Sequence, residues 1–301
     1  MKTCNKIVVV LLFCGLMFDA YSQPRPSNDQ EFSFVFMTDL HVKHDPFVLA
    51  ELSRLTDTIN KMKVDFVLTG GDQVFDVMRG NVKKGDSLFS LYKEQIAKIN
   101  VPVYSCMGNH ELFGIYPESD IDSTHKDYKY GMFQRYLGNP YYSFDHKGWH
   151  FIVLNVLDAA NKKYTGRVDE KQIEWLKQDL SKVNANTPVA IAAHLPFVSS
   201  FYQVYPPKSG GGAASAWIKN RDEVLQLFKN HQLKLVLQGH IHWLEDINVE
   251  NKTHFITGGA VAGRPSWRGN NHGPRGFLLF SVKENTFSWK FIEYGTPGIP
   301  K

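Results

Sequence analysis

Five short segments of the sequence carry side chains that bind metal ions or move protons, and each follows an apolar run typical of a β-strand. In chain order they are Asp39-Leu40-His41, Gly71-Asp72, Gly108-Asn109-His110-Glu111, His194 and Gly239-His240-Ile241-His242. Taken singly, each is ordinary turn chemistry, because Asp, Asn and Gly are common turn residues. Five of them at strand ends indicate more, since the carboxyl ends of parallel strands meet at one edge of a sheet. We therefore expect carboxylates, an amide and several imidazoles to converge on one site.

These ligand types indicate which ions such a site would take. Mixed carboxylate, amide and imidazole ligands suit divalent Mn, Fe or Zn, whereas Ca prefers oxygen ligands alone. The residue types do not select one of the three metals.

The residues between the five segments predict alternating strands and helices. Apolar runs predict strands at 31–38, 64–69, 101–107, 188–193 and 233–238. Apolar residues three or four positions apart predict helices at 47–63, 88–99, 129–137, 169–183 and 217–230. This alternation predicts an α/β fold with a largely parallel sheet and helices on its faces.

Other segments complete the predicted domain. We expect a hairpin over 141–154, loops at the mouth of the site at 111–128 and 199–215, and strands at 253–257, 277–282 and 286–292 that extend a second sheet. No internal repeat or low-complexity linker divides the chain, so residues 31–301 are predicted to form a single domain.

The N-terminus has the pattern of a secretory signal peptide. Lys2 and Lys6 precede an apolar stretch over 7–18, and Ala20-Tyr21-Ser22 provides small residues before a cleavage site at Gln23. We therefore expect a signal peptide over 1–22, a linker over 23–30 and a periplasmic or secreted mature protein.

The remaining composition narrows the class of protein. Phe13 before Cys14 makes a poor lipoprotein site, and no later segment is long and apolar enough for a transmembrane helix. Cleavage would leave only Cys106, which lies in an apolar strand and is expected to be buried, with no intramolecular disulfide. The formal net charge of +4 permits an anionic substrate such as a small phosphate ester. No basic and aromatic stripe indicates a nucleic-acid-binding surface, and nothing in the sequence specifies an oligomeric state.

The order of the motifs resembles one known family. Asp-x-His, Gly-Asp, Gly-Asn-His-Glu, His and Gly-His-x-His are similar to the motifs of the calcineurin-like metallophosphoesterase superfamily, from about residue 31 to the last strands. The resemblance implies a four-layer α/β/β/α sandwich with a dinuclear metal centre. It assigns Asp39, His41, Asp72 and His242 to the first metal, and Asp72, Asn109, His194 and His240 to the second. Asp72 would bridge the two ions.

The resemblance also implies an activity, namely hydrolysis of phosphate mono- or diesters by attack of a hydroxide bound to the two metals. His110 is not needed as a ligand, so it is free to donate a proton to the leaving group or a hydrogen bond to developing charge. Glu111 either orients the site or has a structural role in its loop. The alternatives are a non-catalytic protein that binds metal or phosphate on the same fold, and acyl or peptide hydrolysis at the two metals.

Departures from the branches of the superfamily narrow the resemblance. Purple acid phosphatases have a tyrosine ligand three residues after the bridging aspartate, where this chain has Phe75. Protein Ser/Thr phosphatases have at that position an aspartate that orients the catalytic histidine, and Asp76 is the nearest substitute here. The chain therefore resembles exported bacterial phosphohydrolases and the cyclic-nucleotide phosphodiesterase branch. Arg264, Arg268 and Arg275 are the candidate substrate-binding residues, because arginine can bind phosphate through two hydrogen bonds.

Overall fold

The computed structural model describes residues 30–204, 217–261 and 275–294. The first sheet contains β1 (Glu31–Met37), β2 (Phe66–Thr69), β3 (Val103–Tyr104), β12 (Gly276–Lys283) and β13 (Thr286–Glu293). The second contains β4 (Tyr142–His146), β5 (Trp149–Val153), β8 (Pro188–Ala192), β9 (Gln232–Gln238), β10 (Glu245–Val249) and β11 (Thr253–Thr257). A separate hairpin consists of β6 (Leu157–Ala160) and β7 (Lys163–Gly166). The helices are α1 (Pro46–Asn60), α2 (Val82–Ile96), α3 (Gly131–Leu137), α4 (Glu170–Leu180), α5 (Phe201–Val204) and α6 (Arg221–Gln226), with 3-10 turns η2 (Asn109–Glu111) and η3 (Pro117–Ser119).

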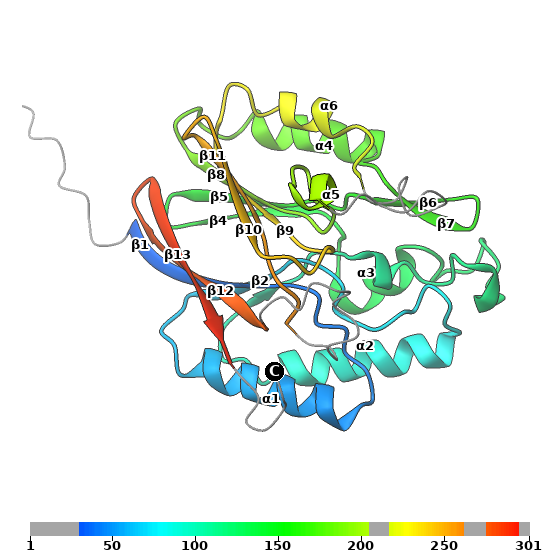
Figure 1. Cartoon of the computed structure of the whole chain (residues 1–301). Coiled ribbons are helices and arrows are strands. Elements are labelled where there is room, and N and C mark those ends of the chain that lie inside the picture. Colours follow the sequence, from blue (N-terminus) through cyan, green and yellow to red (C-terminus); the bar gives the residue numbers. More distant parts are fainter. Residues whose placement is uncertain (1–29, 205–216, 262–274, 295–301) are drawn as a thin grey trace, which may run out of the picture.

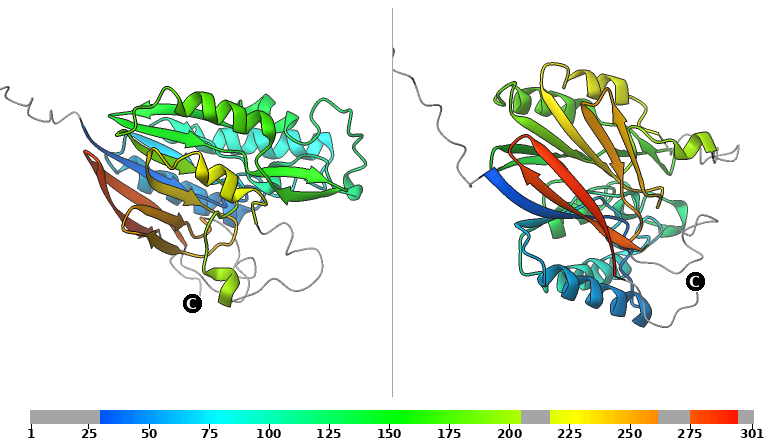
Figure 2. Two further views of the ribbon diagram at one scale, coloured as in Figure 1. Left: turned by 90° about the horizontal axis from the view of Figure 1, so that it is seen from above. Right: turned by 60° about the vertical axis from the view of Figure 1, so that its left-hand side comes forward.

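The two sheets pack face to face and have helices on their outer sides. The strand orders are β13-β12-β1-β2-β3 and β10-β11-β9-β8-β5-β4. Helices α1 and α2 lie outside the first sheet, and α4 and α6 lie outside the second (Figure 1). The views in Figure 2 show the same layering. The predicted four-layer α/β/β/α sandwich is confirmed.

Aromatic side chains fill the space between the two sheets. Phe34 on β1 stacks on Phe66 and Phe280 of its own sheet, at centroid distances of 5.0 and 4.7 Å. It meets Phe151 of the second sheet edge-on at 5.5 Å. Cys106, predicted to be buried, lies in this core with no exposed surface. Offset and edge-on ring contacts of this kind add to the stabilisation from apolar burial.

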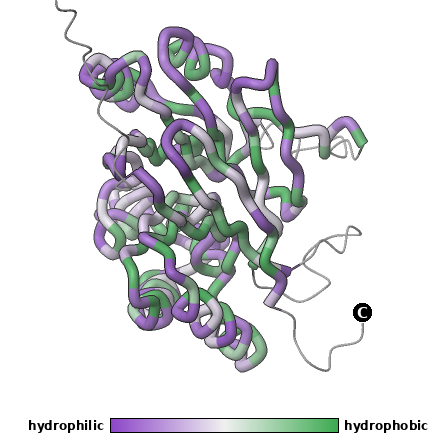
Figure 3. The backbone as a smooth tube through the Cα atoms, turned by 90° about the vertical axis from the view of Figure 1, so that its left-hand side faces the viewer, coloured by the Kyte–Doolittle hydropathy of each residue, from purple (hydrophilic) through white to green (hydrophobic). Residues whose placement is uncertain are grey.

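The outer helices are amphipathic, as their apolar spacing predicts, and polar side chains cap the N-termini of α1 and α2. Buried residues of α1 recur every three or four positions, from Val48 to Ile59, and Figure 3 shows the corresponding alternation of hydrophobic and hydrophilic residues along the helices. The Asp45 carboxylate accepts the Phe47 N–H at the N-terminus of α1, and Asn81 similarly caps α2. Such caps satisfy N–H groups that have no partner within the helix.

The sheet topology corrects two expectations. The strands before the five motifs do not share one parallel sheet, because β1, β2 and β3 belong to the first sheet and β8 and β9 to the second. The three C-terminal strands do not extend one sheet either: β11 pairs with β9, whereas β12 pairs with β1. Residue patterns identify strands, but long-range packing selects their neighbours, so pattern alone could not separate the sheets.

Two predicted loops have different outcomes. The stretch 111–128, expected to lie over the site, begins as part of the fold, because Leu112 and Phe113 have no exposed surface and Phe113 pairs with Lys129, whereas residues 122–124 are exposed. The stretch 199–215 contains α5, and its residues from 205 onwards lie outside the described part of the chain. The predicted signal peptide and nearly all of the linker also lie outside it. Within the described residues, no helix has the length and apolar character to cross a membrane.

Candidate metal centre

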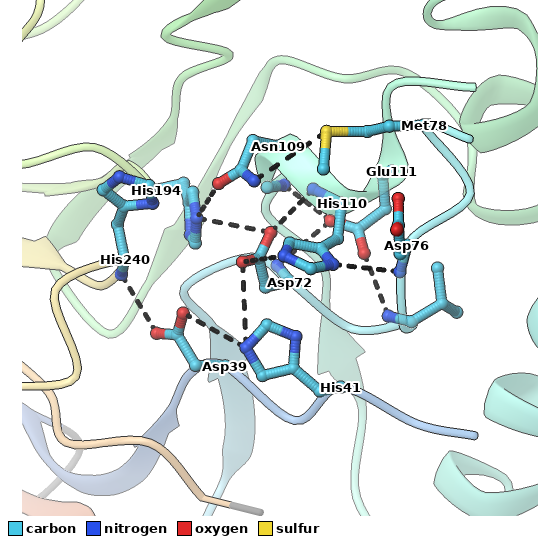
Figure 4. Close-up of polar contacts among 12 residues, drawn as sticks. Asp39, His41, Asp72, Asp76, Met78, Asn109, His110, Glu111, His194 and His240 are labelled. Atoms are coloured by element: carbon cyan, nitrogen blue, oxygen red, sulfur yellow. Dashed lines mark hydrogen bonds and ion pairs between the residues drawn. The ribbon is translucent and has the colours of Figure 1, made fainter. Parts of the chain in front are cut away.

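The loops after β1, β2, β3, β8 and β9 bring the five motifs together (Figure 4). Backbone hydrogen bonds connect these loops. The His41 N–H donates to the Asp72 carbonyl at 2.9 Å, and the Gly239 N–H donates to the His194 carbonyl at 3.0 Å. The site therefore lies where the carboxyl ends of strands from two sheets meet.

The backbone at this site is unusual. Five of the seven candidate ligands are non-glycine residues in the left-handed region, with φ of 57° at Asp39, 47° at His41, 53° at Asp72, 72° at His240 and 52° at His242. Residues with a Cβ adopt this conformation at an energetic cost, and such residues cluster at functional sites. The clustering is independent support for the site.

The first group of candidate ligands consists of Asp39, His41 and His242, whose ligand atoms lie within 4.8 Å of one another. Asp39 Oδ1 is 3.1 Å from His242 Nε2, and the two Nε2 atoms of His41 and His242 are 3.2 Å apart. The other carboxylate oxygen, Oδ2, accepts the Thr38 hydroxyl and the His240 N–H. These donors leave Asp39 Oδ1 directed toward the two imidazoles.

Asp72 connects this group to a second one. Its Oδ1 lies 3.3 Å from His194 Nε2, and its Oδ2 lies 3.9 Å from His41 Nε2. Asp72, His194 and His240 also have ligand atoms within 4.8 Å of one another. The two oxygens of Asp72 thus face different sets of imidazoles, as expected of a bridging carboxylate.

The environment of His194 tests whether a cation fits. Its Nδ1 lies 2.7 Å from the Gly70 carbonyl, which can only accept, so Nδ1 carries a proton. In the neutral ring Nε2 is then an acceptor, and it faces Asn109 Oδ1 at 3.0 Å and Asp72 Oδ1 at 3.3 Å. Three acceptors this close require a positive charge between them, which is supplied either by a second proton on His194 Nε2 or by a cation. A divalent cation fits this requirement, and the partner at Nδ1 orients the ring for it.

The pKa shifts show how strongly the buried carboxylates attract positive charge to the site. Burial lowers the pKa of His194, but the charge of Asp72 outweighs it and raises the pKa to about 9. Burial raises the pKa of Asp39, but His242 outweighs it and the net shift is downward. Burial followed by repulsion from His110 lowers the pKa of His41 to about 3. The Asp39 carboxylate and the His41 imidazole are thus in the forms that bind metals, whereas His194 would release a proton when a metal binds.

His110 lies beside the two groups and contacts Asp76. The Asp76 backbone N–H donates to His110 Nδ1 at 2.9 Å, so Nδ1 is an acceptor and the neutral ring carries its proton on Nε2. That atom is 3.8 Å from Asp72 Oδ2. Asp76 is therefore the partner of His110, but through its amide, because its carboxylate faces Arg79 at 3.3 Å. Phe75 packs its ring against His110 at 5.8 Å.

Glu111 connects the loop that carries Asp72 with its own loop, which begins at Gly108. Its buried carboxylate accepts the backbone N–H groups of Asp72, Val74 and Gly108 at 3.0, 2.9 and 2.7 Å. Burial and the charge of Asp72 raise the pKa of Glu111 to about 8, and the N–H donors oppose that shift. Of the two roles left open for Glu111, these contacts favour the organisation of the site.

Two glycines of the motifs are required by close approach. A Cβ at Gly108 would lie 2.1 Å from the Asp72 nitrogen, and one at Gly71, where φ is +97°, would lie 2.5 Å from His194 Nδ1. The Gly-Gly-Asp and Gly-Asn-His patterns were the sequence signal for these contacts. Thr38, which hydrogen-bonds Asp39, gave no such signal.

The predicted substrate-binding arginines are only partly described. Arg264 and Arg268 lie outside the described residues. Arg275 forms an ion pair with the buried Glu51 on α1 at 3.1 Å, and its guanidinium lies 5.2 Å from the centre of the Phe47 ring. Its contact with α1 means that a role in substrate binding remains a prediction.

Comparison with known proteins identifies relatives that are phosphatases or diphosphatases by name. The chain is 26% identical to a manganese-dependent ADP-ribose/CDP-alcohol diphosphatase of Arabidopsis thaliana over 230 residues, which are 64% of this chain and 69% of the relative. It is 33% identical to purple acid phosphatase 23 of the same plant over 155 residues, 49% of this chain but only 30% of the relative.

Solved structures agree on the fold. A dimetal phosphatase from Danio rerio superimposes with a TM-score of 0.59 and 15% identity, over 88% of this chain and 96% of that one. A protein described as the anchor in the inner membrane complex of Plasmodium gives a TM-score of 0.54 and 19% identity, over 88% and 85% of the two chains. The profile described as calcineurin-like phosphoesterase matches residues 32–244, which contain every motif of the site. The chain belongs to the calcineurin-like phosphoesterase family.

Proposed function

We propose that this metal-dependent phosphoester hydrolase acts on small phosphate mono- or diesters at a centre of two divalent ions. The observation that carries the proposal is the position of Asp72, whose two oxygens face separate groups of ligands. The proposed ligands are Asp39, His41, Asp72 and His242 for one ion and Asp72, Asn109, His194 and His240 for the other. When bound, two such ions supply Lewis acidity and neutralise phosphoryl charge.

His110 is the proposed proton or hydrogen-bond donor. The Asp76 amide occupies Nδ1, so the Nε2–H is the group that can be offered to the oxygen of a departing group. The Glu111 carboxylate accepts the Gly108 N–H, and this hydrogen bond keeps the His110 ring and Asp72 in fixed relative positions. The protein thus contributes to the reaction mainly by holding these groups in place before the substrate binds.

The relatives guide the choice of metal and substrate. The name of the Arabidopsis diphosphatase specifies manganese and substrates with a nucleoside diphosphate group, which supports including Mn and phosphoanhydrides in the assays. Fe and Zn are retained because the ligand types suit all three.

A hydrolysis panel tests the proposal. Metal-free protein is reloaded with Mn, Fe or Zn and assayed on aryl monoesters, aryl diesters, nucleotides, cyclic nucleotides and nucleoside diphosphate esters. We expect turnover with at least one metal, with loss of turnover in Asp72→Asn. Protein that binds two metals but hydrolyses none of these substrates would instead support the non-catalytic binding function.

We also propose that the protein is exported after removal of residues 1–22. The charged start, apolar stretch and small residues before Gln23 support this. Mass analysis of the mature protein should give an N-terminus at or near Gln23, whereas an intact Met1 on protein recovered from the exported fraction would contradict it.

A further inference from the structure

A row of aromatic side chains begins and ends beside candidate metal ligands. Tyr164 on β7 meets His240 edge-on, with ring centroids 6.2 Å apart. At the other end, Trp243 directly follows His242 in the chain, and its ring lies 5.7 Å from that of Phe201 on α5. The row therefore contacts a candidate ligand through Tyr164, and at its other end Trp243 is next to His242 in the chain.

Two further rings complete the row. Tyr202 lies 5.4 Å from Phe201 and 4.7 Å from Trp217. Burial raises the pKa of Tyr202, and the Tyr164 phenol raises it further. Because only a nearby group has this effect, Tyr164 lies near Tyr202. We call Tyr164, Phe201, Tyr202, Trp217 and Trp243 the aromatic wall. Each of the five side chains is half-buried and keeps some surface open to solvent.

The wall is held by the chain segment that carries His240 and His242. Gln238, the last residue of β9, accepts the Phe197 N–H at 2.6 Å. Glu245, the first residue of β10, accepts the backbone N–H and the hydroxyl of Ser200 at 3.1 and 2.6 Å. These contacts fix the start of α5, which stands out from the body of the sandwich (Figure 2). These hydrogen bonds therefore fix the position of the aromatic rings relative to the candidate ligands.

Half-exposed aromatic rings beside a site that binds phosphate can stack on a flat ring of the same ligand. Aromatic side chains stack on flat, π-bonded rings, and one base stacked on such a side chain contributes roughly 1–3 kcal/mol. A sugar separates a nucleobase from its phosphate, so the base lies farther from the metal ions than a ring bonded directly to the phosphate. A directly bonded ring would lie nearer Tyr164, which contacts His240.

We propose that the aromatic wall binds the nucleobase of a substrate whose phosphate lies at the metal centre. The inference depends on the proposed function in one respect, namely that phosphate binds at the centre. It names the substrate class, a nucleotide or a nucleoside diphosphate ester, which the hydrolysis motifs do not specify.

Calorimetry with manganese-loaded protein tests the wall through affinity, and each protein is also made with His110→Ala so that hydrolysis does not distort the heats of binding. The two ligands are adenosine monophosphate and ribose 5-phosphate, which differ only in the base. We expect the nucleotide to bind about 5- to 150-fold more tightly, the ratio that stacking of one base supplies. Trp217→Leu and Tyr202→Leu should each reduce the ratio severalfold with little change in ribose 5-phosphate affinity, and Tyr202→Phe should restore it.

Trp175→Leu is the control, because Trp175 lies on α4 and packs against Tyr141 at 5.0 Å, apart from the wall. It should keep the wild-type ratio. Equal affinity of the wild type for both ligands, no binding of either, or a ratio that survives both leucine variants would overturn the proposal. The proposal would also be overturned if phenyl phosphate binds more tightly than methyl phosphate by the same ratio, and if Tyr164→Leu removes this difference in affinity but Trp217→Leu does not. Discrimination without hydrolysis would contradict only the phosphoesterase function.

Discussion

Replacement of Glu111 by Gln should destabilise the protein by about 2–4 kcal/mol. The carboxylate accepts one N–H at Oε1, from Val74, and two at Oε2, from Asp72 and Gly108. Glutamine can keep one oxygen in place, but its NH₂ group would then face a backbone N–H. A hydrogen bond to a charged group contributes about 1.5–3 kcal/mol, and a buried donor left without a partner costs about 1–3 kcal/mol. The expected loss of stability follows from one lost hydrogen bond and from the weaker hydrogen bonds that a neutral glutamine oxygen accepts.

The assay is urea unfolding of the metal-free protein at pH 9, where Glu111 with its pKa of about 8 is mostly ionised, with Glu94→Gln as the control. Glu94 on α2 is exposed and forms long contacts of 3.5 Å with Lys98 and 3.4 Å with Gln95, so its replacement should change the free energy of unfolding by less than about 0.5 kcal/mol. Manganese affinity of Glu111→Gln should fall roughly 10- to 100-fold, as for other losses of a ligand's supporting partner. If Glu111→Gln behaves like the control in both measurements, Glu111 does not act as an ionised acceptor that holds the loops.

Three other changes have defined outcomes. Asp72→Asn should lower metal affinity and turnover by more than the roughly 10- to 100-fold expected for a supporting residue; near-normal turnover with two metals bound would refute the bridging role. His110→Ala should keep both metals and slow turnover about 10²-fold or more, most for poor leaving groups; equal slowing on good and poor leaving groups would remove the proton-donor assignment. Burial lowers the pKa of His150, but the hydrogen bonds that its ring donates to Asp179 and Asp145 outweigh it and raise the pKa. That stabilisation is complete below the unfolded pKa of about 6.5 and is lost as pH rises through the folded value. The urea midpoint should thus fall from pH 6 to 9, and by less in His150→Gln; an identical fall in both proteins would contradict this.

The local structure of the site could largely be read from the sequence. Apolar runs located the strands that precede Asp39, Asp72 and His194, and turn-forming residues located the loops after them. These features are local, because strand and turn preferences depend on a few neighbouring side chains. Residue types likewise indicated the ligand chemistry, since imidazole, amide and carboxylate donors bind the same metals in any fold.

The sequence by itself therefore determined which side chains are available for the site, and the family to which its motifs are similar. Only the tertiary structure decided that the motifs come from two sheets, that the Asp76 amide rather than its carboxylate contacts His110, and that Phe201 reaches Trp243. The reason is physical. A carboxylate and a backbone N–H at the same position are equally present in the sequence, and the choice between them depends on backbone direction and on packing between residues far apart in the chain.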